Sequence, residues 1–148
     1  MKLTIKLVIV ILVCAWSINA QTTADSANEQ RVPLNEAAVA HDQNGVAALE
    51  GRLRTTEING APDSPVTNVR VVIRNTSGIA YAFVSGVITF YDSGSVRCGE
   101  GIFKADALAV DESFETDTPG VRIRCQVATW RIVATHLLPR VPPNPPRP

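Results

Sequence analysis

The stretches VRVVIRNTSG (residues 69–78) and AFVSGVITFYDSGS (residues 82–95) decide the fold that this sequence predicts. In the first, Val69, Val71 and Ile73 recur at every second position, which is typical of a β-strand that buries one face. In the second, the even-numbered positions from 84 to 90 share a face and hold only Gly and apolar residues. Each stretch ends in Asn or Asp followed by Ser and Gly, which favour turns. The pair indicates β-structure built from short strands and tight turns.

Three more segments show the same period of two. Residues 49–58 predict a weak first strand, residues 121–125 a later strand, and residues 130–135 the final one. No segment of eleven or more residues has a convincing helical period. Six or seven short strands over residues 46–138 predict an all-β fold, an antiparallel β-sandwich, with a small barrel as the alternative.

The first twenty residues have the layout of a secretory signal peptide. Lys2 and Lys6 precede ten apolar residues (7–16), and a small residue, Ala20, ends a more polar stretch. Ten residues span about 15 Å of helix against a hydrocarbon core of about 30 Å, which favours cleavage after Ala20 over an uncleaved membrane anchor. Val13 stands before Cys14 where a bacterial lipoprotein signal has a small residue. We therefore expect an exported protein, periplasmic or extracellular, with no membrane insertion after signal cleavage.

Two segments flank the predicted domain. Residues 21–45 are polar and small, which predicts a flexible arm leading into the domain at residue 46. Residues 139–148 contain six prolines, a density that predicts a disordered or polyproline II tail. The tail also matches the pattern of a proline-rich peptide that recognition domains bind, but a solvated tail is the preferred interpretation.

Composition limits the function further. The chain has 148 residues, which suits one domain, with 14 basic and 14 acidic residues. Without Lys2 and Lys6, the exported chain has twelve basic residues, of which only Lys104 is a lysine. This balance argues against a nucleic-acid binder that relies on bulk charge.

The exported chain keeps two cysteines, Cys98 and Cys125. In an oxidising compartment such a pair favours a disulfide over two free thiols. The bridge stabilises the fold by about 3 kcal/mol in the chain-entropy model. Cys98 shares its face with Val96, and Cys125 with Val121 and Ile123, so we expect both sulfurs to point into the core.

Residues 69–78 and 87–94 resemble the FxLYD-type domains of bacterial exported proteins, in which an apolar strand ends in Asn and a small residue before a Phe-x-Leu-Tyr-Asp strand. Here the second motif is ITFYD (88–92), so two of its four fixed positions differ and both stay apolar. The likeness extends over about residues 68–138, with 108–114 matching an acidic segment that follows. It implies an immunoglobulin-like sandwich, usually without an assigned activity. The cysteine pair and residues 99–104 depart from the pattern.

Candidate catalytic and metal-binding residues are few. His41 falls in the predicted arm and His136 near the last strand, and neither lies in a nucleophile motif. A cluster of carboxylates could in principle hold calcium, but its spacing does not match an EF-hand and a solvated loop is preferred. The cluster comprises Asp106, Asp111, Glu112, Glu115 and Asp117. We therefore predict no enzyme activity, no metal and no cofactor.

Arginines give the clearest functional pattern, because they alternate with apolar residues and should point outward, on one sheet face or on more than one. If several align, they form a rigid donor surface suited to carboxylates, sulfates or phosphates. The alternative is ordinary cross-strand pairing with residues such as Glu50 and Glu57. The candidate residues are Arg52, Arg54, Arg70, Arg74, Arg122, Arg124 and Arg131.

The sequence thus predicts a non-catalytic, exported interaction module. Its outward arginines or an exposed sheet edge would contact another exported protein or an anionic envelope component, and not nucleic acid. The alternatives are a structural envelope component without a specific ligand and, least favoured, an enzyme with an unrecognised site. A sequon begins at Asn75, but an Asn that starts a turn is the preferred interpretation.

Overall fold

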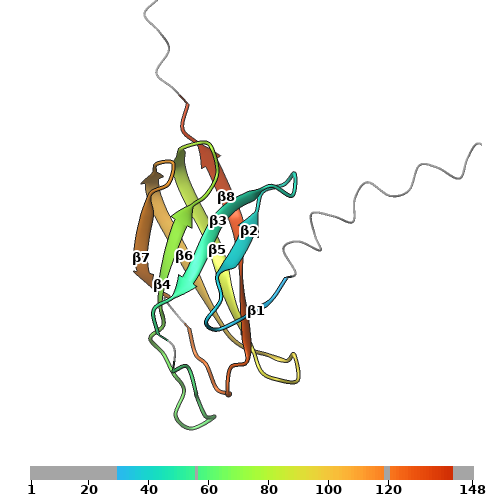
Figure 1. Cartoon of the computed structure of the whole chain (residues 1–148). Helices are drawn as coiled ribbons and strands as arrows, with labels where there is room; N and C mark the ends of the chain where they lie inside the picture. Colours follow the sequence, from blue (N-terminus) through green and yellow to red (C-terminus); the bar gives the residue numbers. More distant parts are fainter. Residues whose placement is uncertain (1–29, 56, 119–120, 142–148) are drawn as a thin grey trace, which may run out of the picture.

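A computed structural model describes residues 30–55, 57–118 and 121–141, and these form eight strands and no helix. The strands make two antiparallel sheets of four, stacked as two layers (Figure 1). Sheet A has the order β1 (Val32–Pro33), β8 (Thr129–Pro139), β5 (Tyr81–Tyr91), β6 (Arg97–Leu108). Sheet B has the order β2 (Ala38–His41), β3 (Ala47–Leu53), β4 (Arg70–Asn75), β7 (Ser113–Asp117). The predicted all-β class is confirmed.

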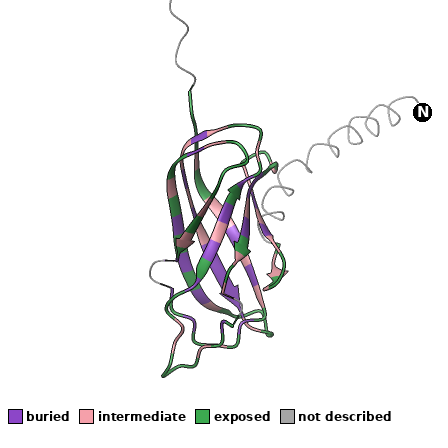
Figure 2. Ribbon diagram, turned by 60° about the vertical axis from the view of Figure 1, so that its left-hand side comes forward, coloured by how far each residue is buried: buried purple, intermediate pink, exposed green. Residues whose placement is uncertain are grey.

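The inner faces of the two sheets share one apolar core. On β5, Val84, Ile88 and Phe90 are completely buried, as the alternation predicts, and on β4 so are Val71 and Ile73. Buried and exposed positions alternate along the strands (Figure 2). Each large apolar side chain removed from water in this way contributes about 1.5–3 kcal/mol. The period of two in the sequence is therefore the pattern of a two-layer, sandwich-like arrangement.

The predicted turn at residues 92–95 joins β5 to β6. Asp92 Oδ1 accepts a hydrogen bond from the Val96 amide at 2.9 Å, and the Ser95 amide donates to the Asp92 carbonyl at 3.0 Å. Farther along the hairpin, a Cβ at Gly86 would lie 2.3 Å from Phe103 Cζ. Glycine is therefore required where the Phe103 ring crosses β5.

Asn75, the sequon residue, is completely buried at the end of β4. Its Nδ2 donates to the carbonyls of Ile79 and Ala109, both at 2.9 Å, and its Oδ1 accepts from the Ser77 amide and hydroxyl. The side chain ties two turns together, as buried polar groups with full hydrogen bonding do. Its turn-forming role is confirmed.

The prediction of a flexible arm over residues 21–45 is wrong for residues 30–45, the part of it that the structure describes. Residues 32–41 contribute β1 and β2, and β2 pairs with β3 with Ala38 opposite Gly51. Ala38 and Ala40 are at most 1% exposed. Alanine gives a weak hydrophobic signal, so a strand whose inward residues are alanines resembles a polar linker in the sequence. Residues 1–29, with the predicted signal peptide, lie outside the described residues.

Other boundaries also differ. The first predicted strand ends at Leu53, and β8 continues to Pro139, which pairs with Tyr81 although the tail was expected to start there. Residues 113–117, interpreted as an acidic loop, form β7. Residues 121–125 form no strand and make only an isolated bridge between Ile123 and Val66. Residues 142–148 lie outside the described residues.

Candidate functional site

The structure divides the seven predicted arginines among three places. Arg52, Arg54, Arg70 and Arg74 lie on the outer face of sheet B, on β3 and β4 or, for Arg54, directly after β3. Arg122 and Arg124 lie on the segment between β7 and β8, and Arg131 lies on β8 in sheet A. The predicted arginines therefore do not form one continuous face.

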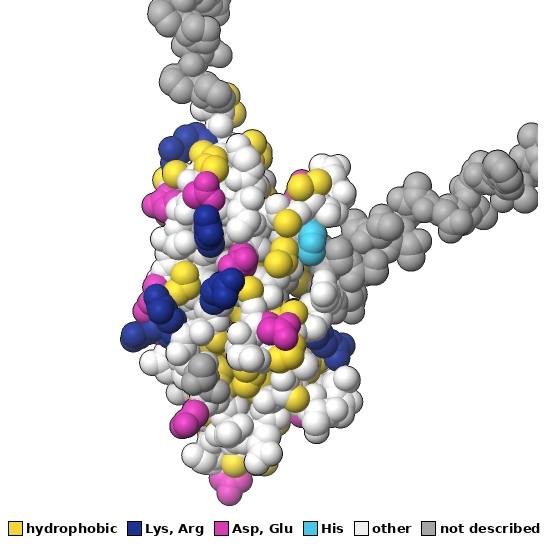
Figure 3. All heavy atoms as spheres, in the orientation of Figure 1, with side chains coloured by type: hydrophobic (Ala, Val, Ile, Leu, Met, Phe, Trp, Pro, Cys, Tyr) yellow, Lys and Arg dark blue, Asp and Glu magenta, His cyan; other side chains and the backbone are white. Residues whose placement is uncertain are grey.

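On sheet B every one of these arginines faces a carboxylate. The pairs are Arg52–Glu50 at 2.8 Å, Arg54–Glu115 at 3.5 Å, Arg70–Glu115 at 3.2 Å, Arg70–Asp117 at 3.5 Å and Arg74–Asp111 at 2.8 Å. Basic and acidic side chains are accordingly mixed over this side of the molecule (Figure 3). Exposed pairs add only about 0–1 kcal/mol each to stability, but they neutralise the guanidinium groups locally. The outer face of sheet B therefore supports the interpretation of cross-strand ion pairing and not that of an anion-binding surface.

Arg131 has a different environment. It is half-buried, and its guanidinium carbon lies 5.7 Å from the centroid of the Tyr91 ring. Arg31 lies over the same ring at 3.8 Å. A guanidinium over an aromatic face is held by the ring quadrupole, so Tyr91 orients both cations.

Arg122 and Arg124 are exposed on either side of Ile123, which is completely buried. The backbone of Ile123 exchanges two hydrogen bonds of 2.9 Å with Val66. The Gly60 amide donates to the Cys125 carbonyl at 2.9 Å. Because the residue between them is anchored in the core, both arginines are presented outward from a fixed backbone.

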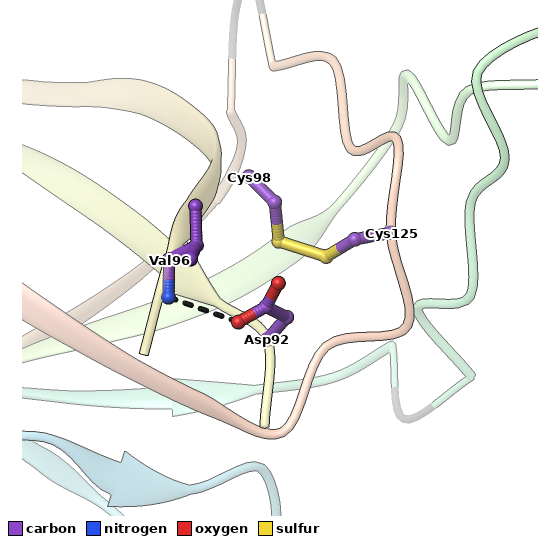
Figure 4. Close-up of a disulfide and its surroundings, with 4 residues drawn as sticks. All are labelled: Asp92, Val96, Cys98 and Cys125. Carbon is purple, nitrogen blue, oxygen red and sulfur yellow. Dashed lines mark hydrogen bonds between the residues drawn. A yellow bond between two sulfur atoms is a disulfide. The ribbon is translucent and has the colours of Figure 1, made fainter. Parts of the chain in front are cut away.

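A disulfide joins Cys125, on this segment, to Cys98 at the start of β6 (Figure 4). The predicted pairing is thus present, but both cysteines are only half-buried. The expectation of a buried bridge is wrong because Val96, used to set the face of Cys98, is 62% exposed. Cys98 falls at the irregularity where the β5–β6 register shifts, and the inward residues of β6 begin at Gly99.

Two glycines let the segment approach β6. A Cβ at Gly99 would lie 2.6 Å from Ile123 Cγ1, and one at Gly101 would lie 2.8 Å from Thr118 Cβ. The Arg124 amide also donates to the Cys98 carbonyl at 3.3 Å. Thr118 and residues 121–125 therefore cover the end of the core beside β6, and Arg122 and Arg124 lie next to Arg97.

An open hollow of about 530 Å³ lies at this place. It is lined by Arg97, Arg122 and Arg124 together with Cys98, Gly99 and Glu100. Arg97 pairs with Glu100 at 2.9 Å. Within residues 30–55, 57–118 and 121–141, no carboxylate lies within ion-pair distance of Arg122 or Arg124. Three guanidinium groups against one carboxylate leave an excess of positive charge. Arg97 is not among the predicted site residues, although its position directly before Cys98 is a sequence signal that it lies at the bridge.

The histidines lie elsewhere. His136 Nδ1 is 3.1 Å from Ser85 Oγ, which also lies 3.0 Å from Thr135 Oγ1. No carboxylate contacts His136 in the described part of the chain, so the pair lacks the group that orients a catalytic imidazole. His41 lines a pocket of about 210 Å³ with Asp42 and Tyr81, at the opposite end of β5 from the hollow.

The acidic residues serve local structure. Asp111, Glu115 and Asp117 pair with arginines, and the Glu112 carboxylate accepts from the Ala109 amide at 2.6 Å. Among the described residues, no group of three or more His, Cys, Asp or Glu side chains is arranged to hold a metal ion. The structure therefore does not bring the predicted acidic cluster together as a ligand set.

Within the described ranges, no helix has the length and apolar character needed to cross a bilayer. No family model matches the chain, and comparisons with curated proteins and with solved structures give no match. The resemblance to FxLYD-type domains therefore stays a prediction.

Proposed function

We propose that this protein is a non-catalytic, exported, immunoglobulin-like interaction module that binds an anionic group of its partner through Arg122 and Arg124, assisted by Arg97. The observation that carries the proposal is a pair of exposed arginines for which the described residues offer no carboxylate partner, on a backbone fixed by a disulfide and by Ile123. The two antiparallel sheets support the immunoglobulin-like part, and the disulfide supports export.

The chemistry of the hollow suits an oxyanion. Each guanidinium offers several N–H donors in a plane and binds carboxylate, sulfate or phosphate oxygens in pairs. Because the backbone is already fixed, little ordering is needed on binding. The hollow is open to water, so the contact should weaken as salt screens it. A carboxylate-bearing exported protein and an anionic envelope polymer both fit this chemistry.

The placement of the histidines supports the non-catalytic part. His136 and Ser85 lie on the outer face of sheet A in mid-strand, and His41 lies at the far end of β5 from the arginines. Neither histidine can therefore act on a group bound at Arg122 and Arg124.

The test is a pull-down from native envelope and medium extracts with disulfide-intact residues 21–148 as bait, at low and high salt. The variant is Arg122→Ser/Arg124→Ser. The control is Arg52→Ser/Arg54→Ser, which removes the same charge at the same spacing from the ion-paired face. We expect the wild-type chain to bind a stoichiometric partner at low salt. High salt and Arg122→Ser/Arg124→Ser should each abolish this binding, whereas Arg52→Ser/Arg54→Ser should retain it at low salt.

A partner retained by both variants would contradict the arginine site and would move the contact to a sheet edge or the tail. No partner under any condition would favour a structural envelope component without a specific ligand. The ion-paired outer face of sheet B is the observation that favours this second function.

A further inference from the structure

The outer face of sheet A differs from that of sheet B because it carries apolar side chains. Val87 on β5 stands opposite Ile102 on β6 and Val133 on β8. Phe83 stands opposite Leu138. None of these five belongs to the core, and Ile102 and Leu138 are 49% and 58% exposed. The row of Val87, Ile102 and Val133 forms an apolar strip across three neighbouring strands, which marks an interaction surface.

Charged residues lie beside this strip in a fixed arrangement. Thr89, two residues along β5 from Val87, stands opposite Arg131 on one side and Glu100 on the other. The Arg131 guanidinium lies over Tyr91, and Glu100 pairs with Arg97, which stands opposite Tyr91. The side chains of Arg131 and Glu100 therefore both point along the strands, from the Thr89 row toward the row of Tyr91. They remain level with each other across β5.

We propose that this face binds a second copy of the chain, around a two-fold axis that runs along β5 between the two molecules. Such a rotation keeps the position along the strand and exchanges the two sides of β5. It places Val87 against Val87 of the partner copy and Val133 against Ile102. It also places each Arg131 opposite the Glu100 of the other copy, which gives two identical ion pairs.

The charge pattern is what selects a second copy as the occupant. One opposite-charge pair, placed symmetrically about a central apolar strand, is complementary to itself under this rotation. The row that contains Ser85, Lys104 and His136 is polar and lies between the Val87 row and Phe83, which stands opposite Asp106 on β6.

The size of the face indicates a weak dimer. Three strands about 4.8 Å apart, and the six residue steps from Phe83 to Thr89 at about 3.4 Å each, give a face of about 10 Å by about 20 Å between backbone positions. This is smaller than a standard stable interface of about 800 Å² per partner. The association should therefore be reversible and depend on protein concentration.

The experiment is sedimentation velocity of residues 21–148 from about 10 µM to about 1 mM, at low salt. We expect the wild-type chain to dimerise as its concentration rises. Arg131→Glu and Glu100→Arg, each alone, should weaken the dimer at least about tenfold through like-charge contacts. An equimolar mixture of these two variants should dimerise again, since each copy then offers the other two opposite-charge pairs.

The apolar strip is tested with Ile102→Lys against Ile79→Lys. Both isoleucines are 49% exposed, but Ile79 lies outside the face, in the turn before β5. Only Ile102→Lys should abolish association, and Arg122→Ser/Arg124→Ser should leave it unchanged. A wild-type chain that stays monomeric throughout, or a mixture that does not associate, would overturn the proposal. Either result is independent of whether the arginine hollow binds an anion.

Discussion

The outer face of sheet B and the segment from residue 121 to 125 present arginines with the same alternation in the sequence. On sheet B, β7 supplies Glu115 and Asp117 beside Arg70, so the charges cancel. At the segment, the neighbouring strand is β6, and the one carboxylate that the described residues place in the hollow is Glu100, with which Arg97 already pairs. The comparison teaches that outward direction alone does not make an anion site. The neighbouring strand decides whether an arginine is neutralised.

The largest effect that separates the two regions should come from the disulfide. Cys98→Ala/Cys125→Ala should lower the free energy of unfolding by about 3 kcal/mol, because the bridge no longer restricts the unfolded chain. The variant should also lose affinity for the partner, since the segment then depends on its backbone bridge to Val66 and the packing of Ile123. Urea unfolding and the pull-down measure the two effects.

The matched comparison for that result is chemical reduction of the wild-type protein. The bridge is half-buried, so a small reductant should reach it without unfolding and should give the same loss of stability. Native, unreduced protein should show no reactive thiol in a titration. A loss of less than about 1 kcal/mol in both experiments would show that Val66 and Ile123 hold the segment without the bridge.

A smaller effect should appear when arginines on the outer face of sheet B lose their carboxylate partners, so that this face resembles the segment from residue 121 to 125. Glu115→Gln/Asp117→Asn removes the carboxylates beside Arg54 and Arg70 and keeps the size of both side chains. We expect salt-dependent binding of an anionic polymer such as dextran sulfate to rise about threefold, with stability changed by less than about 1 kcal/mol. Isothermal titration at two salt concentrations measures this change.

The control removes a carboxylate that pairs with no arginine among the described residues. Asp63→Asn changes the net charge by one at an exposed position outside the strands, so a rise caused by net charge alone would appear there at about half the size. If the double variant binds the polymer no better than this control, the presence of a neighbouring carboxylate is not what distinguishes the two regions.

The sequence predicted those parts of the fold in which large apolar residues alternate. Strands β4, β5 and β8 were found because Val, Ile, Phe and Trp occupy their inward positions. β2 was missed because its inward residues are alanines, and β7 because Phe114 is its only large apolar residue. Residues 121–125 alternate like a strand because they cover the end of the core, but they lack the neighbour that makes a ladder.

The candidate site was predicted only in part for the same reason. Alternation indicates that Arg122 and Arg124 face outward, and the number of cysteines indicates a bridge. Neither signal gives the register between strands. The register places Glu115 beside Arg54 and Arg70, whereas no carboxylate among the described residues lies within ion-pair distance of Arg122. Ion pairing between strands far apart in the sequence has no local signature, so the sequence alone does not separate the paired arginines from Arg122 and Arg124.

The smallest predicted effect concerns Asp42, a carboxylate held by backbone amides and not by an arginine. The Val46 amide donates to its Oδ1 at 2.9 Å and the Asn44 amide at 2.8 Å. The bond from Val46 is the main cause that lowers the pKa of Asp42 below its ordinary value of 3.8. A carboxyl whose pKa is lower in the folded state stabilises the fold above the unfolded pKa and loses this contribution as the pH falls through the folded pKa.

An NMR titration of the Asp42 side chain should therefore have its midpoint below 3.8. The difference in urea midpoint between the wild type and Asp42→Asn should be constant above about pH 5 and should shrink as the pH falls below about 4. Asp63→Asn serves as the control at an exposed position outside the strands. A titration midpoint at or above 3.8 would mean that the turn amides do not hold the charged carboxylate.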